Sequence, residues 1–421
     1  MQVAAPSLPP PPSWLIGMGT LTFGLVAGFV VTALPFLLSK VGVSVDRIAS
    51  VSAVAMSPTF WAFLATPIVD VGFTRRSYSF AFALASAACL CAALWLFSPG
   101  RLGLFTALVL LAELSIVLQN NAVCGWTTEF VCDAERGKVG GWINAANLGG
   151  GALGAMLVMS SASSLSFQAL GMMIAFAALM STLFLVRFPK PADPQFGLRE
   201  IFGGTFRSVV HTSRQPQVLT GFLLFLAPAS CVAAINLFSG LGNEFHASPQ
   251  WVVWTTGLGA AITSAIGSVA GGYIADRMDR GVLYMLGGIL AGLCALLMAL
   301  TPHTQVTFAA GVLVYNCIAG VCYAAFSALG LQLTGIGNPT AATQLGLFAA
   351  ASNAAVVYMT WADGQGFRLF GIRGLLLVDS LAAIGAAIPL LLFLRWRAVG
   401  HAAIAASAAR DAAIAACPAA D

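Results

Sequence analysis

The chain has 421 residues, of which 59% are hydrophobic and only 8% are charged, and its net charge is +4. Soluble domains carry about 25% charged residues, so this composition excludes water as the main solvent and predicts an integral membrane protein. The few cations flank the apolar runs, which argues against nucleic-acid binding.

Twelve apolar runs of about 20 residues follow one another, and this is the length that an α-helix needs to cross a bilayer. Alternating strands of the kind found in membrane barrels are absent from the sequence. We therefore predict an all-α integral membrane fold with 12 transmembrane helices in two six-helix halves. The expected spans are 14–38, 48–70, 77–97, 102–124, 139–160, 168–187, 216–240, 250–275, 281–300, 305–330, 340–362 and 373–394.

The loops on the two sides of the bilayer differ in charge. Of the 19 Lys and Arg residues, only Lys40, Arg47, Arg101, Arg368 and Arg373 fall on the side opposite the termini. Positively charged loops stay on the cytoplasmic side of a membrane. This bias predicts a multi-pass protein of the cytoplasmic (inner) membrane with both termini cytoplasmic.

The most polar long connection lies between the sixth and seventh spans and divides the chain near its middle. The predicted units are a tail at 1–13, a six-helix half at 14–187, a cytoplasmic linker at 188–215, a second six-helix half at 216–396 and a tail at 397–421. The halves resemble each other, because "PIVDVGFTRRS" closes the second span and "GGYIADRMDRG" closes the eighth. Ser44 and Ser248 are expected to cap the same two spans. The similar spacing indicates a parallel duplication.

The segment "GGYIADRMDRG" resembles the loop motif of the major facilitator superfamily, a family of membrane transporters. The matching residues are Gly272, Asp276, Arg277 and Arg280 in the second half and Asp70, Arg75 and Arg76 in the first. The resemblance implies six-plus-six helices that rock about a central cavity. We expect these Asp and Arg side chains to form a latch that is kept in one state and broken in the other. The alternative is that they only anchor the helix ends.

Two carboxylates are predicted to lie deep in the membrane, where a charge costs a few kcal/mol. Asp363 and Glu244 are expected near the outer ends of their spans, which leaves Glu113 and Asp379. Glu113 has no Lys or Arg within one helical turn, so burial favours its protonated form. Both residues are therefore candidates for proton coupling, Asp379 less clearly because Arg373 is near. A neutral Glu113 that only joins two helices is the alternative.

Amides and tyrosines inside the spans are the candidates for a solute-binding cavity. They offer both donors and acceptors, which suits a polar solute with several hydroxyl, carbonyl or amide groups. Some of them are expected only to join neighbouring helices. The candidates are Gln119, Asn120, Asn121, Asn144 and Asn147 in the first half and Asn236, Tyr315, Asn316, Tyr323, Gln344, Asn353 and Tyr358 in the second.

The region of about 34–154 resembles a narrower branch of that superfamily, the AmpG-like muropeptide permeases and acetyl-CoA transporters, which neighbours single-protein siderophore permeases. The resemblance rests on "KVGVSVDRIASVSAVAMSPTFWAFLATPIVD" and on "LQNNAVCGWTTEF" with the following acidic-Arg-Gly loop. The branch typically has two Asp residues after the Gln of the fourth helix. This chain has Asn120 and Cys124 at those positions, so Glu113 is the acid left on the helix.

The predicted function is a secondary active permease that moves a bulky polar organic solute, such as a siderophore or a muropeptide-like compound, by alternating access and proton-coupled import. An exporter of drugs or metabolites on the same fold and a membrane receptor that does not transport remain as alternatives. The nine Cys and four His residues show no metal-ligand or catalytic grouping, and no phosphate-binding loop is present. We expect no enzyme activity, no metal or other cofactor, and a monomer.

Overall fold

The computed structural model describes residues 11–193 and 216–415. These residues form helices joined by turns, and no β-strand occurs among them, as the all-α prediction requires. Within these two ranges, nine helices are long and apolar enough to cross a membrane. Most of the predicted linker at 188–215 lies outside the described residues, and so do positions 1–10 and 416–421 of the predicted tails.

The first half of the chain opens with a long apolar helix, continues with a series of short helices, and then contains four longer units. The first helix comprises α1 (Ser13–Met18), α2 (Leu21–Gly28), the π-helical turn η1 (Phe29–Ala33) and α3 (Leu34–Lys40). The short helices are α4 (Val45–Met56), α5 (Pro58–Trp61), η2 (Ala62–Leu64) and η3 (Thr66–Asp70). The longer units are α6 (Arg75–Trp95), α7 (Leu102–Thr127), α8 (Arg136–Ser161), and α9 (Phe167–Ser181) with η6 (Thr182–Arg187).

The second half also combines a broken segment with long helices, but there the broken segment comes first. It opens with α11 (Pro216–Leu226) and the short turns η8 (Pro228–Ser230), η9 (Ala233–Asn236), η10 (Phe238–Gly240) and η11 (Gly242–Phe245). The next helix comprises α12 (Pro249–Trp254), the π-helical turn η12 (Thr255–Gly259) and α13 (Ala260–Ala275). The chain ends with α14 (Arg280–Leu300), α15 (Gln305–Thr334) and α16 (Ala341–Ala415).

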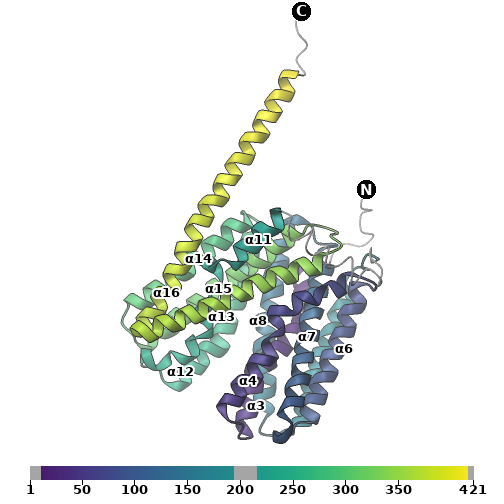
Figure 1. Cartoon of the computed structure of the whole chain (residues 1–421), viewed down its shortest axis with the longest axis vertical. Helices are drawn as coiled ribbons and strands as arrows, with labels where there is room; N and C mark the ends of the chain where they lie inside the picture. Colours follow the sequence, from purple (N-terminus) through teal and green to yellow (C-terminus); the bar gives the residue numbers. More distant parts are fainter. Residues whose placement is uncertain (1–10, 194–215, 416–421) are drawn as a thin grey trace, which may run out of the picture.

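Four of the predicted spans do not stand as separate continuous helices. α16 contains the last two spans, because its backbone leaves helical geometry at Phe370 and Gly371 and doubles back there (Figure 1). The segments 45–70 and 216–245 are broken where Pro58, Pro67 and Pro228 occur, since proline cannot donate the backbone hydrogen bond of a helix interior. The count of twelve therefore stays a prediction, whereas the positions of the other apolar helices agree with it. The predicted tail at 397–421 continues α16 as a helix to residue 415.

Each half has its own buried apolar core. One cluster is built from the first half alone and includes Phe29, Phe105 and Ile174. Another is built from the second half alone and includes Phe245 and Phe308. Each half therefore packs around its own core.

The halves meet at one end of the bundle, which we call the proximal end because Asp70 and Asp276 lie there. Two small apolar clusters combine the halves at this end, one with Trp126 and Leu331 and the other with Val69 and Ala342. At the opposite, distal end, α3 and α4 of the first half diverge from α12 of the second (Figure 1). Contacts across the halves are thus concentrated at the proximal end.

Close packing of α2 on α8 depends on glycine. A Cβ atom at Gly28 would overlap the backbone of Gly151, whereas a Cβ at Gly149 would meet no atom within 4 Å. Glycine lets two membrane helices approach until their backbones touch.

We expect Gly28→Ala to lower the thermal denaturation midpoint of the purified protein in detergent, because overpacking costs about 1–3 kcal/mol. Gly149→Ala is the matched control on the facing helix and should leave the midpoint unchanged or raise it, since alanine favours helix formation. Equal midpoints for the two variants would show that the close approach of α2 and α8 does not limit stability.

Candidate functional site

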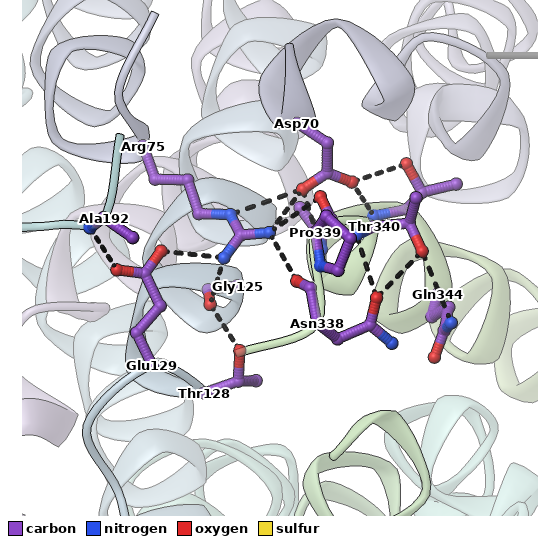
Figure 2. A network of polar contacts seen from close by, with 12 residues as sticks. Asp70, Arg75, Gly125, Thr128, Glu129, Ala192, Asn338, Pro339, Thr340 and Gln344 are labelled. Atoms are coloured by element: carbon purple, nitrogen blue, oxygen red, sulfur yellow. Dashed lines mark hydrogen bonds and ion pairs between the residues drawn. The ribbon is translucent and has the colours of Figure 1, made fainter. Parts of the chain in front are cut away.

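The Asp70 carboxylate joins the two halves at the proximal end (Figure 2). Asp70 ends η3, and its Oδ2 accepts hydrogen bonds from the backbone N–H of Thr343 at 2.9 Å and from the Thr343 hydroxyl at 2.7 Å. Its Oδ1 accepts one from the N–H of Ala342 at 3.3 Å. Thr343 and Ala342 lie in the first turn of α16, where backbone N–H groups have no partner within the helix. A carboxylate of the first half therefore caps a helix of the second half, which the helix dipole also favours.

Arg75 holds this carboxylate from the other side. Its guanidinium donates to Asp70 Oδ1 at 2.8 Å from Nη2 and at 3.3 Å from Nε. The same group donates to the carbonyl of Gly125 at 3.1 Å and to the carbonyls of Asn338 and Pro339 at 3.0 and 3.1 Å. Asn338 and Pro339 precede α16, so Arg75 also bridges the halves. Its side chain is only 9% exposed.

Glu129 extends this network toward the connection between the halves. Its Oε1 accepts a hydrogen bond from Arg75 at 2.8 Å, and its Oε2 accepts one from the backbone N–H of Ala192 at 2.8 Å. Burial raises the pKa of the Glu129 carboxyl, and the Ala192 N–H and the Arg75 guanidinium act in the opposite direction. The carboxyl is thus stabilised in its charged form only while these partners stay in place.

Asp276 makes the equivalent contact in the reverse direction. It lies at the end of α13, and its two oxygens accept from the backbone N–H groups of Gly137 at 2.6 Å and Lys138 at 3.0 Å. Both belong to the first turn of α8. Arg280 donates to Asp133 Oδ1 at 3.0 Å and also to the Asp133 carbonyl. A carboxylate of the second half therefore caps a helix of the first half.

We call these contacts the Asp70 clamp and the Asp276 clamp. The expected ion pair is present in the first, with Asp70 and Arg75 at 2.8 Å, while Arg280 and Asp276 are 3.8 Å apart. Arg76 and Arg277, also predicted for the latch, form no ion pair with any described residue.

The partners of the clamps could not be read from the motif. The donors at the starts of α8 and α16 are mostly backbone N–H groups, which every residue except proline carries, so the sequence does not single them out. Gly272, the predicted motif glycine, packs against Gly137, where a Cβ would approach the carbonyl oxygen of Gly137 to 2.6 Å. It thus allows α13 to approach α8 closely enough for the second clamp.

Two of the predicted cavity amides instead bond across the halves. Asn144 donates to the carbonyl of Tyr323 at 2.9 Å and to the hydroxyl of Ser327 at 2.7 Å, so it joins α8 to α15. Asn353 donates to the carbonyl of Thr59 at 2.8 Å, so it joins α16 to α5. These bonds support the packing interpretation in this state.

Other predicted residues have partners within their own half. Asn121 donates to the Thr66 hydroxyl at 3.0 Å, and the Tyr358 hydroxyl donates to the Leu226 carbonyl at 2.7 Å. Asn121 is buried and Tyr358 is exposed, and a hydrogen bond holds each of them. The remaining members of this set donate to the Thr360 hydroxyl (Asn236), the Val312 carbonyl (Asn316) and Asp379 (Tyr315).

A different set of polar groups is buried without any partner among the described residues. Glu113 is 2% exposed, and its Oε2 accepts no hydrogen bond. The side-chain amide of Gln119 is unpaired at both ends, and the amide oxygens of Asn120, Asn147 and Gln344 are also unpaired. A buried polar atom without a partner costs roughly 1–3 kcal/mol, so such groups indicate a ligand, water or proton that completes them.

The second half contains a pair of buried acids. Asp379 is 3% exposed and accepts a hydrogen bond from the Tyr315 hydroxyl at 2.9 Å. Asp363 is fully buried, and neither of its oxygens has a partner among the described residues. Asp363 lies about two helical turns before the kink at Phe370 and Gly371, so its expected position near an outer span end stays a prediction. Arg373, predicted to be near Asp379, forms no ion pair with it in the described part of the chain.

The fold therefore defines a polytopic helical membrane protein whose two halves are clamped at one end. Residues 16–360 match the sequence profile of the Major Facilitator Superfamily. The chain belongs to this superfamily.

Solved structures of superfamily members share the fold. The human organic anion transporter MFSD10 (TETRAN) has a TM-score of 0.67 and 18% identity over 90% of this chain and 100% of its own. The proton:xylose symporter XylE bound to 6-bromo-6-deoxy-D-glucose has a TM-score of 0.71 and 14% identity over 89% and 94%. The transporter FucP in the outward conformation has a TM-score of 0.69 and 13% identity over 90% and 98%. No curated protein sequence matches this chain, and the narrower AmpG-like resemblance stays a prediction.

We expect Asp70→Ala to open the Asp70 clamp selectively, because it removes the acceptor for the first turn of α16. Hydrogen–deuterium exchange of the purified protein should then be at least about tenfold faster at Ala342 and Thr343, since each lost bond had protected its amide. The amides of Gly137 and Lys138 should change less.

Asp279→Ala is the matched control for this experiment. Asp279 caps α14 through the Val282 N–H and lies in an equivalent loop, but no hydrogen bond or ion pair joins its side chain to the other half in the described part of the chain. Unchanged exchange at Thr343 in the Asp70 variant would show that the carboxylate does not hold the halves together.

Proposed function

We propose that the protein is a secondary active permease that works by alternating access between its two halves. The observation that carries this proposal is the pair of reciprocal clamps, in which each half caps a helix of the other at one end of the bundle. Contacts made by a few hydrogen bonds to backbone N–H groups can be broken and remade as the halves rock, and the apolar clusters that the halves share are small. Family membership supports the same conclusion.

The positive loops support an orientation with the proximal end at the cytoplasm. In that orientation the structure corresponds to a state closed to the cytoplasm, with the distal ends of the halves apart. We propose the organisation into halves at 14–187 and 216–396, with a cytoplasmic linker between them and both termini cytoplasmic. The protein is proposed to act as a monomer in the inner membrane.

Glu113 is the proposed coupling acid of the first half. It is buried in α7 and has no cationic partner among the described residues, so its neutral form is the stable one when the halves are in this arrangement. Exposure to water in another arrangement would let it ionise. A group that gains and loses a proton with the conformational change can couple a proton gradient to transport.

The proposed solute is a bulky, polar organic molecule such as a siderophore or a muropeptide-like compound. The unpaired amide of Gln119 and the unpaired amide oxygens of Asn120, Asn147 and Gln344 support this choice, because they leave acceptors free for the donors of a polar solute. Uptake is the proposed direction. An exporter with the same fold uses the same contacts, so transport assays in both directions separate the two.

The test of the function is solute counterflow in proteoliposomes that contain the full chain, with siderophores and muropeptides as the screened compounds. Counterflow of one compound is expected, together with accumulation driven by an imposed pH gradient. A solute that binds without counterflow would identify a receptor instead and overturn the proposal.

We expect Glu113→Gln to abolish accumulation driven by a pH gradient while leaving counterflow within about twofold of the wild type, because glutamine mimics the neutral acid permanently. Glu244→Gln is the control, since Glu244 is an exposed carboxylate. Accumulation that persists in the Glu113 variant would remove this residue from coupling.

We expect Asn120→Ala to weaken binding of the identified solute about fivefold or more, since one uncharged hydrogen bond contributes about 1 kcal/mol. Asn121→Ala is the matched control. Because Asn121 already donates a hydrogen bond to Thr66, this variant should lose thermal stability and keep its affinity for the solute. Binding is measured by isothermal titration calorimetry. Equal affinity of the Asn120 variant and the wild type would assign Asn120 to packing.

A further inference from the structure

The buried acids Asp363 and Asp379 share one site in the second half. They lie on the two arms of α16, before and after the kink at Phe370 and Gly371, and they are close enough to interact electrostatically. Close packing of Gly366 on Gly374 brings the arms together next to this site. Both carboxylates are at most 3% exposed.

The site has no compensating positive charge. The titratable groups that face it are Tyr315 from α15, Cys294 from α14 and Cys231 from the turn after η8. No Lys, Arg or His of the described residues forms an ion pair with either acid. Two ionised carboxylates side by side in an apolar environment repel each other strongly, so the pair does not hold two negative charges here.

The surroundings distinguish the two acids. Asp379 accepts a hydrogen bond from the Tyr315 hydroxyl at 2.9 Å, and the backbone of Ala234 is also within its hydrogen-bonding reach. Hydrogen-bond donors favour the charged form of an acid. Asp363 has no donor on either oxygen among the described residues. The charge therefore belongs on Asp379 and the proton on Asp363.

The groups around the site favour a proton over a metal cation. A bound cation needs several oxygen atoms that face it as acceptors. The contacts of Asp379 with Tyr315 and with the backbone at Ala234 instead point donors at the carboxylate. A single proton completes the site without further ligands.

The same site touches a segment that is not regular helix. Cys231 and Ala233 pack against Ala355 and Met359 of α16. Between them Val232 adopts a left-handed backbone conformation with φ of 49°. That conformation is unfavourable for a β-branched residue and persists only where the surroundings enforce it. A change of charge at Asp379 would alter one of the contacts that hold this segment.

We propose that Asp363 and Asp379 form a second proton-binding site, distinct from Glu113, in which Asp363 carries the proton and Asp379 the charge. When the site opens to water, the Asp363 O–H bond breaks and the proton passes to water, which leaves two carboxylates. Their repulsion separates the arms of α16 and releases the segment at 231–236. Proton binding at this site does not depend on the proposed function, whereas the coupling of this proton to transport rests on it.

The test is infrared spectroscopy of the purified full chain at stepped pH, without any solute. A protonated carboxyl group has a C=O stretching band that shifts in D₂O, and in a Glu113→Gln background this band reports the remaining buried acids. We expect the band at neutral pH and its loss in alkali. Adding Asp363→Asn should remove the band, whereas adding Glu244→Gln should leave it unchanged.

Asp379→Asn keeps the proposal testable if the Asp363 variant does not fold. In the Glu113→Gln background, the Asp379→Asn variant should retain the band. The pH at which half of the band is lost should move by at least one unit toward acid, because the neighbouring negative charge is gone. A merely structural Asp379 would not move the midpoint.

Three results would overturn the proposal. The first is that the Glu113→Gln variant shows no such band, and the second is that the band persists after Asp363→Asn is added. The third is that the band disappears at neutral pH when sodium chloride replaces choline chloride, which would assign the site to a metal cation. Because no solute is present, failure of the transport assays leaves this measurement unaffected.

Discussion

The arrangement of the halves depends on one interaction, the capping of a helix N-terminus in one half by a carboxylate from the other. The first turn of any helix leaves backbone N–H groups without partners, and in a bilayer such groups need another acceptor. Asp70 supplies it to α16 and Asp276 supplies it to α8. Because the acceptor belongs to the opposite half, satisfying the helix ends also joins the halves. Both contacts lie at the proximal end, so the distal ends remain free to separate.

The charged and the unpaired polar groups occupy different parts of this frame. Arg75 and Arg280 lie at the proximal end, where both are buried and both pair with acidic side chains, although Nε of Arg280 has no partner among the described residues. Glu113 and Asp363 lie inside the bundle without cations, where a neutral acid is the stable form. The clamps depend on charged carboxylates, whereas the interior acids are stable when they are protonated, so the two kinds of site respond to different changes. A change of protonation inside and a break of the clamps at one end can therefore be linked through the same rigid helices.

Several features followed directly from local sequence. Apolar length placed α6, α7, α8, α14 and α15 to within a few residues, because the hydrocarbon thickness sets the length of a helix. The motif around Asp276 indicated the proximal contacts. The sequence was less informative about burial, because Asp363 stands just after the end of a predicted span and is nevertheless buried without a partner among the described residues. The amides show the same limit, since Asn120 and Asn121 are neighbours in sequence yet one oxygen is unpaired and the other amide bonds Thr66.

The sequence alone therefore defines the membrane class, the helical fold and the residue types available for chemistry, because hydropathy and length are properties of a single helical segment. Only the tertiary structure assigns partners. Ala342 and Gly137 contribute backbone N–H groups that almost any residue could supply, so nothing in their side chains marks them as the targets of Asp70 and Asp276. The pairing of Asp363 with Asp379 likewise arises from the reversal of α16 at Gly371, which brings together two carboxylates that local patterns treat as unrelated.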